Sequence, residues 1–173
     1  MKIIIIIFLL VNGSILMADN RPILSEKDGL LYEETSDLPF NGVHTIFYED
    51  GSIKEKNSYI NGKKEGERKT FHKNGMVFED EMYADGKLED VFRGYYDNGA
   101  LWWEGTALNN NRHGAIKVLH ATGEINYRGH YEFNLKVGLW EFFDLDGEIE
   151  KIECYEDNLI VDPTACNMSV SNK

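Results

Sequence analysis

Histidine and carboxylate side chains recur at regular intervals along this chain of 173 residues. His72 and His120 are separated by twice the interval that separates Glu55 from Glu79. Clustered histidines bind metal ions, and two carboxylates about 5–10 Å apart in a cleft can hydrolyse a glycosidic bond. Whether these groups meet depends on the elements that position them, and the spacing of turn residues predicts those elements.

Turn-forming residues recur every 24 positions, which indicates a repeat protein. In the first series the recurring residue is always glycine: Gly51, Gly75, Gly99, Gly123 and Gly147. Asp, Asn or Thr precedes each one, and Asp-Gly or Asn-Gly between apolar segments predicts a type I′ hairpin turn. The second series holds only the two residues that best tolerate positive φ: Gly62, Gly86, Asn110, Asn134 and Asn158. A third series predicts further turns: Gly42, Gly66, Asp90, Gly114 and Gly138.

Each 24-residue unit predicts two strands. The first unit reads as a strand over 42–48, a tight turn and a strand over 52–59, and residues 60–66 then reverse the chain into the next hairpin. Polar side chains lie between apolar-leaning positions in the first strand of every unit, which predicts one solvated face. These polar residues are Thr45, Lys69, Arg93, Lys117 and Glu141.

The fold class that follows is all-β. We expect five tandem β-hairpin repeats over residues 39–161, forming an elongated, twisted antiparallel meander. Residues 19–38 resemble half a unit and are expected to form an N-terminal cap, and residues 162–173 a polar C-terminal tail.

This architecture separates the candidate reactive groups. Equivalent residues of adjacent units lie about 10 Å apart, because each unit adds two strands at about 4.8 Å. His72 and His120 are two units apart, too far for one metal ion, and the calcium-like segment 144–148 reads as a hairpin turn. The carboxylate spacing would allow hydrolysis, but an open array offers no enclosed pocket. We expect no enzyme activity, metal site or cofactor.

The first 18 residues predict a cleaved secretory signal. Lys2 precedes an apolar run over 3–11, which is too short to span a bilayer, and Ala18 precedes the expected cleavage site. The alternative is a buried N-terminal strand. An exported protein, periplasmic or secreted, matures in an oxidising compartment, so Cys154 and Cys166 are predicted to form a disulfide rather than remain free thiols.

Charge and aromatic residues indicate the type of partner. The net charge of −12 argues against nucleic-acid binding and favours a basic protein. Trp102 and Trp103 point to opposite faces of a strand, so at least one is expected to be exposed. With Tyr96 and Tyr127 they are candidate partner-binding residues. The alternative is ring packing across neighbouring strands.

Three segments carry a family resemblance. Tyr48–Gly66 and Gly138–Gly147 resemble the bacterial variant of the MORN repeat. Gly29–Gly42 resembles the start of YwqK-type proteins, commonly labelled toxin–antitoxin system antitoxins. The resemblance covers about 28–160 and implies a hairpin array for protein or membrane contact, with no catalytic residues to carry over. We therefore expect an exported protein-binding or scaffold module. The alternatives are a membrane-surface protein, a toxin-neutralising protein and, least favoured, a carbohydrate hydrolase.

Overall fold

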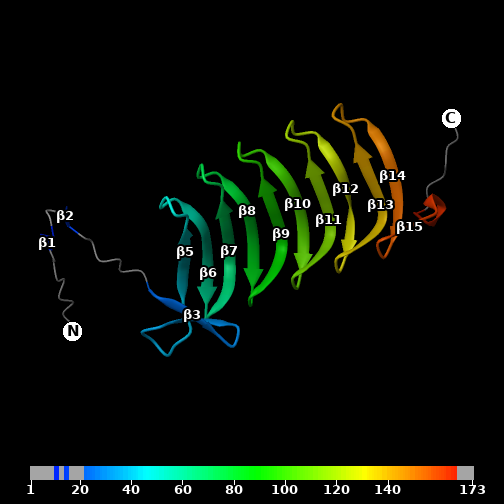
Figure 1. Ribbon diagram of the computed structural model, residues 1–173. Coiled ribbons are helices and arrows are strands. Elements are labelled where there is room, and N and C mark those ends of the chain that lie inside the picture. The colour runs from blue at the N-terminus through cyan, green and yellow to red at the C-terminus, as the bar shows by residue number, and fades with distance from the viewer. Residues whose placement is uncertain (1–9, 12–13, 16–21, 167–173) are drawn as a thin grey trace.

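The protein is a long antiparallel β-meander, seen in a computed structural model that describes residues 10–11, 14–15 and 22–166 (Figure 1). Eleven strands form one sheet, and each strand pairs with its neighbours in the chain. The predicted all-β meander is confirmed. The strands are β5 (Gly42–Phe47), β6 (Ile53–Ile60), β7 (Lys63–Phe71), β8 (Val77–Ala84), β9 (Lys87–Tyr95), β10 (Leu101–Leu108), β11 (Asn111–Leu119), β12 (Ile125–Glu132), β13 (Leu135–Phe143), β14 (Ile149–Glu156) and β15 (Leu159–Val161).

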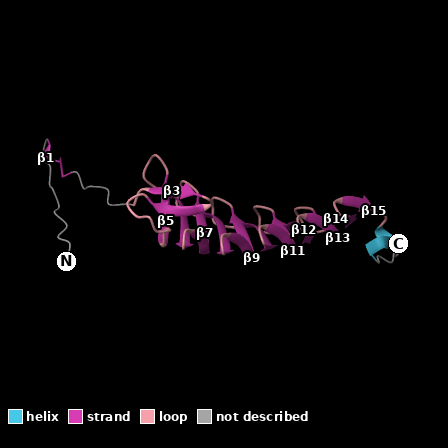
Figure 2. Cartoon of the chain, turned by 90° about the horizontal axis from the view of Figure 1, so that it is seen from below, coloured by secondary structure: helices cyan, strands magenta, loops and turns pink. Residues whose placement is uncertain are grey.

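A separate hairpin of β3 (Leu24–Lys27) and β4 (Leu30–Glu33) lies against the first repeat. The Leu31 N–H donates to the Gly62 carbonyl at 2.9 Å, and the Gly62 N–H donates to the Phe40 carbonyl at 2.9 Å. The first of these bonds joins β4 to the first inter-repeat turn, so the hairpin covers one corner of the array. Figure 2 shows them stacked on the N-terminal end of an otherwise single-layered sheet.

The two chain ends are described only in part. The paired strands β1 (Leu10–Val11) and β2 (Ser14–Ile15) lie in the expected export signal, and the rest of residues 1–18 falls outside the described residues. The short 3₁₀-helix η1 (Pro163–Cys166) begins the expected tail, and residues 167–173 are not described. Across the described segments, no helix is long and apolar enough to cross a membrane.

The Asp-Gly turns are not of type I′, so that prediction is wrong. Gly51 has a φ of 84° but Asp50 does not have a positive φ, whereas a type I′ turn needs both. The Gly51 N–H donates to the Tyr48 carbonyl at 3.0 Å, and the Asp50 carboxylate accepts the Ser52 N–H at 2.9 Å. The acid is therefore favoured here because its side chain caps the turn.

Type I′ geometry occurs at the opposite end of each hairpin, between repeats. Asn61 and Gly62 have φ of 51° and 76°, and Asn109 and Asn110 have 52° and 67°. The reversal is shorter than the predicted loop over 60–66, because β7 already begins at Lys63.

The series that includes Gly66, Asp90 and Gly114 does not form turns, which is a second correction. Gly66 has a φ of 82° but lies within β7, where the pairing with β6 shifts register between Asn57 and Tyr59. The positive φ belongs to a β-bulge rather than a chain reversal.

The two faces of the sheet differ. We call the side that carries Phe92, Trp103, Ile116, Tyr127 and Trp140 the core face. It holds most of the buried apolar residues, and Trp140 is only 1% exposed. A Cβ at Gly129 would collide with the Trp140 ring, so glycine lets the indole lie flat on the neighbouring strand. The opposite side is the ladder face, named for its cross-strand ion pairs.

Side-chain hydrogen bonds join each repeat to the next at the end of the sheet that holds the turns at Gly51, Gly75, Gly99, Gly123 and Gly147. We call this end the Asp-Gly end. The Tyr48 hydroxyl donates to the Phe71 carbonyl at 2.7 Å, and the Tyr96 hydroxyl donates to the Leu119 carbonyl at 2.8 Å. The equivalent histidine, His72, contacts the next repeat's carbonyl in the same way. Stacking between repeats thus rests on directed bonds as well as on the sheet ladder.

Candidate binding groove

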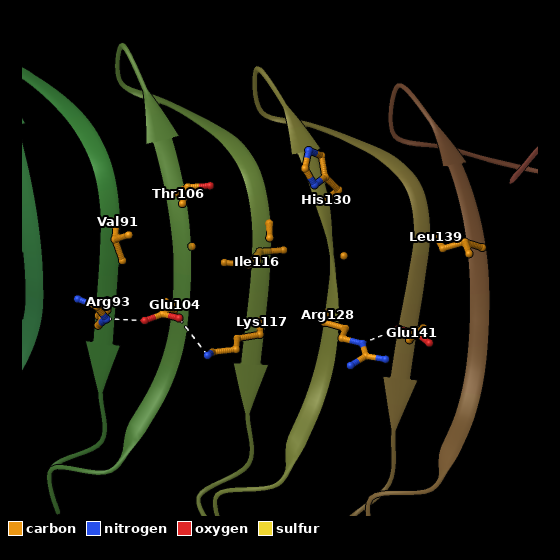
Figure 3. Close-up of a pocket in the computed structure, with 13 residues that line it drawn as sticks. Val91, Arg93, Glu104, Thr106, Ile116, Lys117, Arg128, His130, Leu139 and Glu141 are labelled. Carbon is orange, nitrogen blue, oxygen red and sulfur yellow. Dashed lines mark hydrogen bonds and ion pairs between the residues drawn. The ribbon is translucent and has the colours of Figure 1, made fainter.

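A groove of about 540 Å³ crosses the ladder face from β9 to β13 (Figure 3). Val91, Ala115 and Leu139 supply its apolar wall, and they occupy equivalent positions in three consecutive repeats. Thr106 and His130 line it from the strands between. The 24-residue repeat therefore builds one continuous feature across three units.

Charged side chains line the groove beside this apolar wall. Glu104 binds two cations: its carboxylate lies 2.5 Å from Arg93 Nε and 3.0 Å from Lys117 Nζ. The hydrogen bonds from Lys117 and Arg93 hold the pKa of Glu104 below its usual value. Arg128 Nε lies 2.5 Å from the Glu141 carboxylate. The side chains of Lys117 and Arg128 are 42% and 51% exposed, so both remain open to a ligand.

Sequence reasoning found only half of this site. Arg93, Lys117 and Glu141 belong to the predicted solvated series, and they do lie on the open side of the sheet. Glu104 and Arg128 lie directly opposite them in the ladder but in a different series of the repeat. Glu104 and Arg128 are themselves 24 residues apart, so the repeat spacing could have identified them as a second series.

The four candidate aromatic residues do not form one surface. Trp103 and Tyr127 pack against the buried cluster of the core face, with the Trp103 ring centroid 5.2 Å from that of Phe92. Ring packing, the alternative interpretation, therefore describes these two. Trp102 is 37% exposed and its ring centroid lies 5.5 Å from that of Tyr96, near the Asp-Gly end of the sheet. At least one tryptophan is thus exposed, as predicted.

The candidate carboxylates meet on the core face of the first two repeats around one arginine. Arg68 lies 3.0 Å from Glu55, 3.3 Å from Glu79 and 2.7 Å from Glu81. Burial alone would raise the pKa of Glu55, but hydrogen bonds from Arg68 and Asn57 outweigh it and lower the pKa. The spacing of Glu55 and Glu79 therefore builds an ion-pair cluster around Arg68.

The remaining candidates have structural contacts. Cys154 and Cys166 form the predicted disulfide, which ties η1 to β14. The Asp144 carboxylate accepts backbone N–H groups of Asp146 and Glu148, as in an ordinary capped turn. Within the described part of the chain, no group of three or more His, Cys, Asp or Glu side chains is arranged to hold a metal ion.

A comparison with known protein families identifies the type of repeat. The family model described as MORN repeat variant matches residues 40–61, 64–85 and 136–157. The matches support a MORN-repeat protein. Their starting points fall on the 24-residue spacing, and the unmatched stretch between them contains two more units of the same sheet. No curated protein matches the chain.

Proposed function

We propose that this MORN-repeat protein is an exported, non-catalytic module that binds a protein partner in its ladder-face groove. The groove carries the proposal, because apolar walls beside partly exposed charges are typical of protein interfaces. MORN repeats also often mediate protein interactions. An open single-layered sheet offers contact area rather than the enclosed pocket of an enzyme.

Two aspartate substitutions at equivalent positions test the groove. Val91 lines it, whereas Val43 lies outside it and is 60% exposed. We expect Val91→Asp to abolish retention of a protein from the exported fraction that the wild type and Val43→Asp both retain. Equal retention by all three proteins, each with its disulfide intact, would contradict a groove-bound partner.

Export rests on residues 1–18 and is supported by the Cys154–Cys166 disulfide, which suits an oxidising compartment. The mature protein would begin at Asp19, with the cap at 19–38 and the repeats at 39–161. Mass spectrometry of the exported protein tests this proposal. A mass that still contains residues 1–18 would contradict cleavage.

Two narrower roles follow from the resemblance. The lead-in Gly29–Gly42 suggests a bacterial YwqK-type protein, whose antitoxin label would make the bound partner a toxin. A MORN-like membrane-surface role is disfavoured, because a chain of net charge −12 is repelled by an anionic leaflet. Co-sedimentation with anionic vesicles that survives Val91→Asp would favour the membrane role over the groove.

A further inference from the structure

The charged residues of the groove belong to a longer row on the ladder face. Each member lies directly opposite the next across the strands from β5 to β14. In order across the sheet the row reads Thr45, Lys56, Lys69, Asp80, Arg93, Glu104, Lys117, Arg128, Glu141 and Ile152. It therefore holds five cations and three acids, in a chain that has 30 acidic and 18 basic residues overall.

We infer that this row binds an acidic segment of the partner protein, an inference that rests on the proposed function. The row is locally basic although the chain as a whole is acidic, so the local charge is opposite to what composition suggests. An extended segment that crosses the strands along the row would place its carboxylates against these cations. Its apolar side chains would meet Val91, Ala115 and Leu139 beside the row.

Two pairs of like charges face each other across neighbouring strands of the row. Lys56 lies directly opposite Lys69, and Lys117 lies directly opposite Arg128. Like charges opposite one another on a sheet are destabilising, and opposite charges are favoured. A carboxylate placed between the members of either pair would relieve the repulsion.

The carboxylates of the protein itself do not saturate the row. Glu104 is shared by two cations, and Lys69 pairs with Glu67 of its own strand. Lys56 is exposed and forms no ion pair among the described residues. Even with Glu67 included, the cations outnumber the acids by one, which leaves donors free for a ligand.

The dimensions of the row set the length of the segment. Lys56 on β6 and Arg128 on β12 are six strand spacings apart, or about 29 Å at about 4.8 Å per strand. An extended chain covers this distance in about nine residues. A narrow segment of that length contacts mainly the row, whereas an anionic membrane surface would also face acidic residues beyond it, in a chain with 30 Asp+Glu. These considerations favour a peptide segment over a bilayer.

Binding of a fluorescein-labelled deca-glutamate peptide, measured by anisotropy at 50 mM and 200 mM salt, tests the inference. The test variant is Lys56→Gln with Lys117→Gln, which leaves Glu104 paired with Arg93. We expect about 5-fold weaker binding, because each exposed contact contributes a few-fold at most, and weaker binding at the higher salt. A penta-glutamate peptide should bind more weakly, because it cannot span both like-charge pairs.

The matched control is Lys54→Gln with Lys73→Gln, which removes the same charge beside the Tyr48 ring, outside the row. It should bind the peptide within 2-fold of the wild type.

No binding by the wild type, or equal weakening in both double variants, would overturn the inference. Preferential binding to phosphatidylserine vesicles that the test variant loses would also overturn it, by assigning the row to a membrane. If Val91→Asp loses the captured partner while the test variant keeps it, the proposed function stands and the acidic segment is wrong.

Discussion

The core face is built from the same repeat positions in two different ways. In the last three repeats it carries packed aromatic rings, with Trp140 surrounded by Tyr131, Tyr155 and Tyr127 at 5.1, 5.9 and 6.0 Å between centroids, mostly in edge-to-face contact. In the first two repeats it carries Arg68, at the position equivalent to Trp140, among three glutamates. The same backbone geometry thus accommodates either aromatic or charged side chains on this face.

One repeat position differs between the two regions. Gly105 and Gly129 occupy it in the third and fourth repeats, where aromatic rings lie over them, and Glu153 occupies it in the fifth, at the end of the aromatic region. Asn57 and Glu81 occupy it in the first two, and both belong to the ion-pair cluster. A side chain at this position prevents a ring from lying flat on the strand, so the space is filled by hydrogen-bonded polar groups. The folding cost of burying those groups depends on every charge keeping a partner.

Removing the central ring of the aromatic region should have the largest effect on stability. Trp140→Ala deletes the most buried large side chain, so we expect the free energy of unfolding to fall by about 3–5 kcal/mol. Urea denaturation followed by circular dichroism measures it. Trp102→Ala removes the same side chain from a site that is 37% exposed and should cost clearly less. Equal losses would contradict an aromatic core on this face.

The disulfide secures the C-terminal end of the aromatic region, whereas β3 and β4 cover the ionic end. Its loop of 12 residues predicts a loss of about 3 kcal/mol on reduction. Because repeat proteins open locally, reduction should speed amide hydrogen exchange in β13–β15. Exchange in β6 and β7 should not change. Uniformly faster exchange would indicate that the two regions unfold as one unit.

Arg68→Met tests the ionic region by leaving three carboxylates without their common partner. We expect a loss of about 2 kcal/mol at pH 7, below the range for fully buried pairs because the cluster is partly exposed. The pKa of Glu55 is lowered in the folded state, so its contribution is present above the unfolded pKa and lost as pH falls through the folded pKa. The difference between wild type and variant should therefore shrink at pH 3.

Denaturation at both pH values, with Arg93→Met as the control, distinguishes the cluster from an ordinary ion pair. The Arg93 side chain is 38% exposed, against 17% for Arg68, and its removal leaves Glu104 paired with Lys117. Its loss should be well under 1 kcal/mol at either pH. A pH-independent deficit in Arg68→Met would show that packing, rather than charge, carries the effect.

The sequence predicted the repeat and its faces but not which end of each hairpin has which turn. Asp50-Gly51 and Asn61-Gly62 look alike in sequence, yet only the second pair has positive φ at both residues. The difference depends on strand pairing on either side, which one short motif does not encode. Cross-strand ion pairs were missed for the same reason, because register links two series of the repeat that lie apart in the chain.

A paired departure in the repeat could have been recognised. The tyrosine position of the repeat is Ala107 in the third unit. Tyr83, Tyr131 and Tyr155 each have a cation over the ring, whereas Tyr59 in the first unit has the Phe40 ring beside it. Lys64 Nζ lies 5.0 Å from the Tyr83 centroid, and Lys136 Nζ lies 4.7 Å from that of Tyr155. In the unit with Ala107, the equivalent cation is replaced by Leu88, which packs against the core. Ring and cation change together because each supplies the other's contact.

The hydrogen bonds between repeats at the Asp-Gly end should contribute least, and they occur in the repeats of both the ionic and the aromatic region. Tyr96→Phe removes one hydrogen bond, from the Tyr96 hydroxyl to the Leu119 carbonyl at 2.8 Å, and should cost about 1 kcal/mol. Tyr95→Phe is the control, since the hydroxyl of Tyr95 has no hydrogen-bond partner among the described residues, and it should change stability by less than about 0.5 kcal/mol. Urea denaturation of both variants measures the difference. Because Tyr48 makes the same bond in the ionic region, Tyr48→Phe should match Tyr96→Phe. Unequal losses would show that the stability contributed by these inter-repeat hydrogen bonds depends on the side chains of the core face rather than on the repeat itself.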